Sequence, residues 1–227
     1  MERYSRYAVY YTPPEGAFAD QLAAWLGWDG ARGAPVANPD IDSVDVTAIT
    51  ETPRKYGAHG TLKPPMRLAD GHSAEDLRAA TARLAASLAP VTVERLEIAP
   101  LGRFLALVPT GDVTGLADLA ARVVMELDPM RAAPSEAELA KRRAAQLSPA
   151  QEAHLDRWGY PYVLDQFRFH ITLTGRLDKP TLAAAEAALA RHLSPPAPFV
   201  IDALSLCGER TVDGRFELIE RMPLTAG

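Results

Sequence analysis

The sequence lacks the features that mark disulfide-rich, zinc-finger or membrane proteins. It contains one cysteine, Cys207, which excludes an internal disulfide framework and a cysteine-rich zinc site and is consistent with a reducing cytoplasm. The chain has no His-x-x-x-His or His-Glu-x-x-His pattern, so we expect neither a metal nor a cofactor. No stretch approaches the ~18 apolar residues of a membrane helix. The N-terminal residues from Met1 run into a short apolar strand, and we expect no signal peptide, no membrane association and a cytoplasmic protein.

Positive charge is also scarce. The 24 lysines and arginines are outnumbered by 29 aspartates and glutamates, which gives a net charge of −5. This balance disfavours a surface that tracks long nucleic acid and makes an RNA end a less favoured partner than a small phosphorylated molecule. The 227 residues are 48% hydrophobic, which is enough for a substantial core. The sequence leaves the oligomeric state open.

What the chain does contain is a repeated motif. His-x-Thr-Leu occurs at His59–Leu62 and again at His170–Leu173, and each copy is followed after nearly the same interval by Gly-Arg-Phe, at residues 102–104 and 214–216. Chance predicts far less than one copy of the tetrapeptide in a chain of this composition. A helix-like Ala/Leu stretch lies inside each interval. The chain therefore reads as two copies of one supersecondary unit.

Each unit is expected to contain a motif strand, a helix and a pair of strands. In the first unit a helix begins at Ser73, with acidic residues in its first turn. Its counterpart in the second unit is expected over 178–193. The strand pairs are expected over 91–98 with 103–108, and over 199–206 with 216–221.

Further elements precede and separate the two units. A first strand is expected over 4–11, a helix that ends near Gly27, a loop over 30–39 and a strand over 44–49. An amphipathic helix is expected around 116–127. Ser135 and Ser148 each begin a Ser-x-x-Glu/Gln capping box, which predicts two helix starts in an insertion over about 130–160.

These elements predict an α+β fold in which a duplicated, bilobal chain forms two antiparallel sheets around a central cleft, with helices outside. We expect a single domain over 1–227. Lobe one covers about 1–110 and lobe two about 165–227, and the arrangement allows strands to exchange between the lobes. No flexible linker or low-complexity tract divides the chain.

The motif spacing predicts a shared site. Side chains alternate between the faces of a strand, so His59 and Thr61 project together from one face. His170 and Thr172 do the same on their own strand. If the lobes are related by an approximate two-fold axis, the two strands lie side by side, and two imidazoles and two hydroxyls face one cavity.

This set of groups suits phosphoryl chemistry. One imidazole can take a proton from an attacking oxygen while the other protonates the departing oxygen, since histidine titrates near neutral pH. The threonine hydroxyls can donate to the non-bridging phosphate oxygens. Charged and aromatic residues close to the motifs in sequence are candidates for substrate binding: Arg54, Lys55, Tyr56, Lys63 and Arg168.

Over essentially its whole length the chain resembles the two-histidine phosphoesterase superfamily, which includes cyclic nucleotide phosphodiesterases and 2′-5′ RNA ligase-like proteins. The longer strings at 53–65 and 167–177 are similar to a bacterial branch named for phosphonate metabolism. That branch usually has an aromatic residue where this chain has Ala58. The resemblance implies metal-independent opening of a cyclic phosphodiester by His59, Thr61, His170 and Thr172. It also implies His170 as the base that activates water and His59 as the acid.

Two classes of function follow from these patterns. The first is a hydrolase of the cyclic phosphodiesterase type that acts on a small ribose or nucleotide cyclic phosphate. The second is a binding module that holds a nucleotide or an RNA end without turnover. The presence of all four residues His59, Thr61, His170 and Thr172 favours the enzyme, because a pure binder has no need for two groups that titrate near neutral pH. RNA end joining is a further enzymatic alternative, which the acidic balance disfavours.

Overall fold

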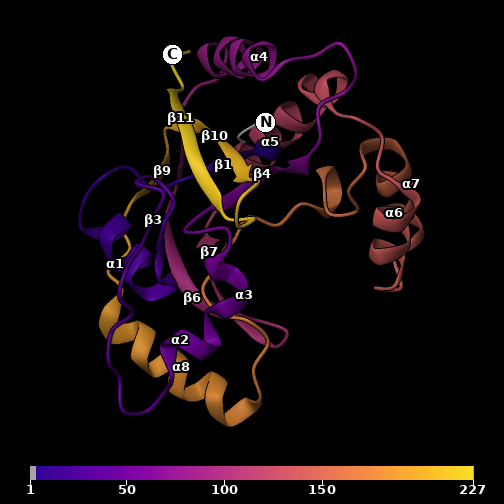
Figure 1. Cartoon of the computed structure of the whole chain (residues 1–227). Helices are drawn as coiled ribbons and strands as arrows, with labels where there is room; N and C mark the ends of the chain where they lie inside the picture. Colours follow the sequence, from indigo (N-terminus) through magenta and orange to yellow (C-terminus); the bar gives the residue numbers. More distant parts are fainter. Residues whose placement is uncertain (1–3, 227) are drawn as a thin grey trace.

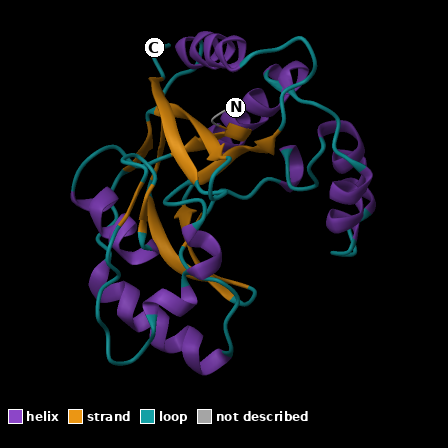
Figure 2. Cartoon of the chain, in the orientation of Figure 1, coloured by secondary structure: helices purple, strands orange, loops and turns teal. Residues whose placement is uncertain are grey.

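The computed structural model describes residues 4–226 and shows a mixed α+β fold (Figure 2). Residues 1–3 and 227 lie outside the described residues. The expectation that the chain begins without a signal peptide falls partly on the first three of these. The expectation of an α+β fold with antiparallel strand pairing is confirmed.

The main sheet has seven strands in the order β11-β10-β1-β4-β8-β7-β6. Their bounds, in that order, are Phe216–Pro223, Ala203–Arg210, Tyr4–Tyr11, Gly60–Met66, Ile171–Thr172, Phe104–Thr110 and Arg95–Leu101. Every neighbouring pair is antiparallel. Strands β4 and β8 pair through Gly60 and Ile171 alone, so the sheet consists of two halves joined at the two motifs.

Helices cover each half of the sheet (Figure 1). Helix α4 (Ala74–Ala86) contacts β10 and β11, and α5 (Thr114–Glu126) contacts β4. Helix α8 (Lys179–His192) contacts β6 and β7 in the other half, and α1 (Ala17–Leu26) contacts β2 (Trp28–Asp29), which lies outside the main sheet. The strand pair that follows α4 therefore joins the half beneath α8, and the pair that follows α8 joins the half beneath α4.

The helices expected after Ser73 and over 178–193 are confirmed. Ser73 caps α4, where its hydroxyl accepts from the Asp76 N–H and the Asp76 carboxylate accepts from the Ser73 N–H. Asp178 caps α8 and accepts from the Thr181 N–H. Gly27 ends α1 in the left-handed conformation, with φ of 76°.

The strand expected over 44–49 is wrong. These residues form the short helix α2 (Val46–Ile49), which is followed by α3 (Glu51–Arg54). The Asp45 carboxylate accepts from the Ala48 N–H and starts the helix. Val46 and Ile49 are buried and lie three positions apart, which is a helical spacing. The apolar pattern of the segment is therefore compatible with a helix as well as with a strand.

Two expected strands are each divided. The segment expected over 91–98 forms β5 (Val91–Val93) and then β6, with a break at Glu94. The segment expected over 199–206 forms β9 (Phe199–Ile201) and then β10, with a break at Asp202. Strands β5 and β9 pair with each other in a separate two-stranded sheet, and the loop expected over 30–39 contributes to another, formed by β2 (Trp28–Asp29) and β3 (Ala34–Pro35).

Between α5 and β8 the chain forms η1 (Asp128–Met130), α6 (Glu136–Arg143), α7 (Pro149–Trp158) and η2 (Leu164–Gln166). Both helix starts expected from capping boxes are confirmed, at Ser135 and Ser148. Helices α6 and α7 lie beside each other at one side of the molecule (Figure 1), where Arg143 of α6 pairs with Glu152 and Asp156 of α7.

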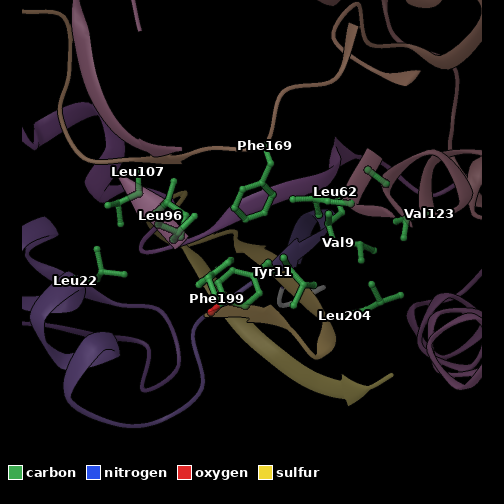
Figure 3. Close-up of a cluster of buried hydrophobic side chains, with 14 of the residues drawn as sticks. Val9, Tyr11, Leu22, Leu62, Leu96, Leu107, Val123, Phe169, Phe199 and Leu204 are labelled. Atoms are coloured by element: carbon green, nitrogen blue, oxygen red, sulfur yellow. The ribbon is translucent and has the colours of Figure 1, made fainter. Parts of the chain in front are cut away.

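The core extends across both halves of the sheet (Figure 3). Phe169 lies two residues before the start of β8, and its ring projects into the cluster, with its centroid 6.1 Å from that of Tyr11 and 6.2 Å from that of Phe199. Gly60 of β4 leaves room for this ring, because a Cβ at Gly60 would lie 2.3 Å from it. The ring of Phe169, next to the second motif, thus packs directly against the backbone of Gly60 in the first motif.

We predict that Gly60→Ala destabilises the protein by about 1–3 kcal/mol, the usual cost of overpacking a core. Urea unfolding measures this change. The matched control is Gly115→Ala in α5, where the added Cβ meets Val91 at an ordinary 3.6 Å. Equal stability of the two variants would contradict the proposed close packing between Gly60 and Phe169.

Candidate active site

The register of the central pair sets the geometry of the two motifs. Gly60 is the partner of Ile171 in the antiparallel pair of β4 and β8. Continued by one residue on each side, this register places His59 opposite Thr172 and Thr61 opposite His170. Both histidines immediately precede the strands rather than lie within them. The four side chains share one face of the sheet, and the imidazoles lie on a diagonal.

All four side chains line one cavity of about 780 Å³. Its walls come from the β6–β7 turn, from α7 and from the extended segment before β8. Aromatic and amide side chains contribute to these walls: Phe104, Gln151, Tyr160, Tyr162, Gln166 and Phe167. The cavity has the size of a small-ligand site, and polar and apolar side chains both line it.

Both histidines are oriented by the same local contact. Nδ1 of His59 lies 3.0 Å from the Gly57 carbonyl oxygen, and Nδ1 of His170 lies 2.9 Å from the Arg168 carbonyl oxygen. A carbonyl can only accept, so each Nδ1 carries the proton and donates. In the neutral imidazole Nε2 is then the atom that can take up a proton. The two repeated histidines therefore have the same tautomer, with the proton on Nδ1.

The surroundings of His59 favour its neutral form. Its ring centroid lies 4.2 Å from that of Tyr10 and 5.6 Å from that of Tyr56. Burial, with a smaller contribution from positive charge on His170, lowers the pKa of His59 to about 4, although the hydrogen bond to Gly57 acts to raise it. Positive charge on His170 therefore disfavours protonation of His59.

Lys63 does not lie in the cavity. Thr61 pairs with Tyr10 of β1 whereas Lys63 pairs with Val9, and the register shifts between these two pairs. Tyr10 and Val9 face opposite sides of the sheet, so the shift turns Lys63 towards the core, where its Nζ donates to the Val124 carbonyl at 3.0 Å. Lys63 is 1% exposed, and burial lowers its pKa to about 8.

Arg54 and Lys55 are engaged elsewhere as well. Arg54 donates to the carbonyl oxygens of Leu26 and Thr47, at 2.9 and 2.7 Å, and so ties α3 to its neighbours. The Nζ of Lys55 lies 2.8 Å from the Glu209 carboxylate. Neither residue lines the cavity that holds the four motif side chains.

Tyr56 and Arg168 lie at the site. Arg168 is exposed and lines the large cavity. Tyr56 lines an adjoining cavity of about 300 Å³ that also contacts His59, Thr61 and Thr172. Its ring stacks on Phe216 with the centroids 5.2 Å apart. The Gly-Arg-Phe repeat thus supplies Phe216 behind Tyr56 and, in its first copy, Phe104 near His170, whose ring centroid is 6.1 Å away.

Several lining residues escaped the sequence analysis. Tyr10 comes from a strand read as core, and Tyr160 and Tyr162 come from the extended segment after α7. The Tyr-Pro-Tyr string was the available signal, because an aromatic pair in an extended segment needs a surface to pack against.

Across residues 4–226, three or more histidine, cysteine, aspartate or glutamate side chains nowhere gather as they would around a metal ion. None of the helices described there combines the length and hydrophobicity that a bilayer span requires.

A model of the family described as "Protein of unknown function (DUF1045)" matches residues 61–217, which is more than half of the chain and includes Thr61 and the whole second motif. The chain belongs to the DUF1045 family. This membership rests on sequence and assigns no activity.

Two curated relatives of this DUF1045 chain carry the name ribose 1,5-bisphosphate phosphokinase PhnN. The protein of Janthinobacterium sp. (strain Marseille) is 35% identical over 234 residues, covering 99% of this chain and 52% of the relative. The protein of Laribacter hongkongensis (strain HLHK9) is 35% identical over 216 residues, covering 94% of this chain and 50% of the relative. The chain thus spans about half the length of these relatives.

Two solved structures are similar along the whole chain. One is described as the crystal structure of a phosphoesterase, with 17% identity, coverage of 98% of this chain and 99% of that chain, and a TM-score of 0.43. The other is E. coli LigT complexed with 3′-AMP, with 17% identity, coverage of 99% and 100%, and a TM-score of 0.43.

The position of Lys63 generates a prediction for Lys63→Met. Because burial lowers the pKa of Lys63 from its usual 10.5 to about 8, the folded protein holds this proton less tightly than the unfolded chain. The cost of burying the charge is complete below pH 8 and is relieved as the pH rises towards 10.5. Relative to the wild type, the methionine variant should therefore be more stable at about pH 7 than at about pH 10.

Urea unfolding of both proteins at the two pH values measures this difference. A relative stability of Lys63→Met that is unchanged or greater at the higher pH would contradict the buried position. The KM for any phosphorylated substrate should be the same in both proteins, because Lys63 faces away from the cavity.

Proposed function

We propose that the chain is a metal-independent phosphoesterase that opens a small cyclic phosphodiester by general acid and base catalysis from two histidines. The observation that carries the proposal is the meeting of His59, Thr61, His170 and Thr172 in one cavity. The identical contacts of the two Nδ1 atoms support it, because they leave both Nε2 atoms for proton transfer.

The reaction balances with the groups present. One neutral imidazole takes a proton from water through Nε2 as the water oxygen attacks phosphorus. The bond between phosphorus and one ring ester oxygen breaks, and the other imidazole, initially protonated, gives its proton to that oxygen. The Thr61 and Thr172 hydroxyls donate to the non-bridging oxygens, where negative charge builds up in the transition state. The first imidazole then releases a proton to solvent and the second takes one up, which restores the starting protonation states.

The surroundings of the histidines favour His59 as the base. Its pKa of about 4 keeps it neutral over the range in which a base must accept a proton. The family resemblance implies the opposite assignment, with His170 as base. The rings of Tyr10 and Tyr56 are the reason for the difference, because they bury His59 and disfavour its charged form.

For the substrate we propose a ribose that carries a cyclic phosphate, in phosphonate metabolism. The curated relatives are named for a kinase that acts on ribose 1,5-bisphosphate, and this chain matches only about half of each. The chain contains no Gly-Lys pair, which the Walker A loop of a P-loop kinase requires. We therefore assign the named kinase activity to the other half of the relatives and a reaction on a related ribose phosphate to this half.

The test of function is turnover of four compounds in the presence of a chelator: adenosine 2′,3′-cyclic phosphate, ribose 1,2-cyclic phosphate, and the 5-phosphorylated form of each.

We predict that His59→Ala and His170→Ala each lower kcat by about 10²–10⁴-fold, the usual effect of removing a proton-transfer group. Thr61→Ala and Thr172→Ala should have smaller effects. His72→Ala, at an exposed position, is the matched control and should leave turnover unchanged.

Turnover that disappears in chelator and returns with added metal would contradict the mechanism. Binding of these compounds without turnover would instead support the binding module.

The pH dependence tests the assignment of the base. With His59 as base, kcat/KM should be constant at weakly acidic pH and fall as the pH drops through about 4, where the imidazole becomes protonated. It should fall again at higher pH, when the general acid loses its proton. An acidic limb with a midpoint above about pH 6 would exclude His59 with its lowered pKa as the base in the free enzyme.

A further inference from the structure

The smaller cavity adjoins the motif cavity and is a separate compartment of the same site. The two share His59, Thr61, Pro64, Tyr160 and Thr172 as walls. A molecule whose reacting phosphate lies between the two histidines can therefore extend into this second space without leaving the site.

Positive charge lines the second compartment. Arg6, on β1, makes two bonds to the Glu209 carboxylate, at 2.6 and 2.7 Å, and Lys55 reaches the same carboxylate at 2.8 Å. Burial raises the pKa of Glu209, but the hydrogen bonds from Arg6, Lys55 and Ser5 lower it to about 2, so the carboxylate is ionised. One negative charge is shared by two cations, which leaves a surplus positive charge beside the compartment.

Arg142 of α6 adds a further cation to the lining of the compartment. Its guanidinium lies over the Tyr160 ring, 4.5 Å from the centroid. The neighbouring Arg143 is paired with Glu152 and Asp156 of α7. Among residues 4–226, by contrast, no carboxylate lies within ion-pair distance of Arg142. Of the two arginines in the basic run at 141–143, Arg143 therefore pairs with the neighbouring helix and Arg142 lines the site.

The Tyr10 hydroxyl completes the lining. Tyr10 is 1% exposed, and within the described part of the chain its hydroxyl has no hydrogen-bond partner. A buried hydroxyl without a partner is uncommon, because it loses its bonds to water without replacement. Tyr10 lines the compartment together with Arg6 and Arg142, so an anion bound there would have a neutral donor and two guanidinium groups within its surroundings.

We propose that this compartment binds a second phosphate group, a monoester carried by the same substrate whose cyclic phosphate reacts between the two histidines. The inference rests on the proposed function and narrows its substrate to a ribose cyclic phosphate that bears a separate phosphate monoester. Guanidinium groups suit this anion, because they donate several hydrogen bonds to phosphate oxygens in a fixed geometry.

The test is the selectivity ratio, which is kcat/KM for a 5-phosphorylated compound divided by kcat/KM for the same compound without that phosphate. The ratio is measured for the two pairs named above. Wild-type protein should prefer the phosphorylated member by about tenfold or more. Arg142→Gln should lower the ratio by about tenfold or more, through KM, and Tyr10→Phe, which keeps the ring against His59, by about two- to tenfold.

Arg143→Gln is the matched control, since it removes an equal charge from the next position of α6 and should leave the ratio at its wild-type value. An unchanged ratio in Arg142→Gln, including an equal loss of activity on both members of a pair, overturns the proposal and leaves the proposed function intact.

A binding arm separates this inference from the proposed function. If none of the four compounds is turned over, calorimetry with ribose 5-phosphate, and with ribose as its uncharged counterpart, tests the compartment directly. Binding of ribose 5-phosphate that weakens about tenfold in Arg142→Gln but not in Arg143→Gln supports the compartment although the proposed reaction fails. Binding that does not depend on Arg142 overturns it.

Discussion

The site depends on one contact between the two halves of the sheet. Strands β4 and β8 pair only through Gly60 and Ile171, and the Phe169 ring packs where a side chain at Gly60 would lie. This contact fixes the spacing and the facing direction of both motifs at once. The helices α4 and α5 on one half, and α8 on the other, stabilise the strands that hold the contact in place. The four motif side chains share a cavity because of it.

The features that the sequence predicts well are those set by local interactions. The capping boxes at Ser135 and Ser148 involve residues three positions apart, so the sequence alone identifies both helix starts. The alternation of side chains along a strand similarly predicts that each histidine and its threonine face the same way. The repeat adds the expectation of two related units, which no single motif could supply.

The predictions that depend on tertiary packing are less successful. Simple alternation places Lys63 on the same face as Thr61. A register shift between β4 and β1 instead turns the Lys63 side chain into the core. No local sequence pattern predicts that shift. Arg54 is near the first motif in sequence, yet free carbonyl oxygens at the ends of two helices bind it. Val46 and Ile49 fit either a strand or a helix, and the cap at Asp45 decides between them.

The duplicated motif does not make the two histidines equivalent. Both donate from Nδ1 to a carbonyl two residues earlier, which is the part that the repeat encodes. Their surroundings come from unrelated segments: Tyr10 and Tyr56 pack around His59, whereas Phe104 lies near His170. A division of labour between a base and an acid therefore arises from packing and not from the motifs themselves.

The central claim is that the two motifs form a single phosphate site. A crystal structure of the protein with inorganic phosphate tests it most directly. The account predicts one phosphate that accepts hydrogen bonds from Nε2 of both His59 and His170, with the hydroxyls of Thr61 and Thr172 on its other oxygens. Imidazoles more than ~10 Å apart, beyond the reach of one phosphate and a bridging water, would contradict it.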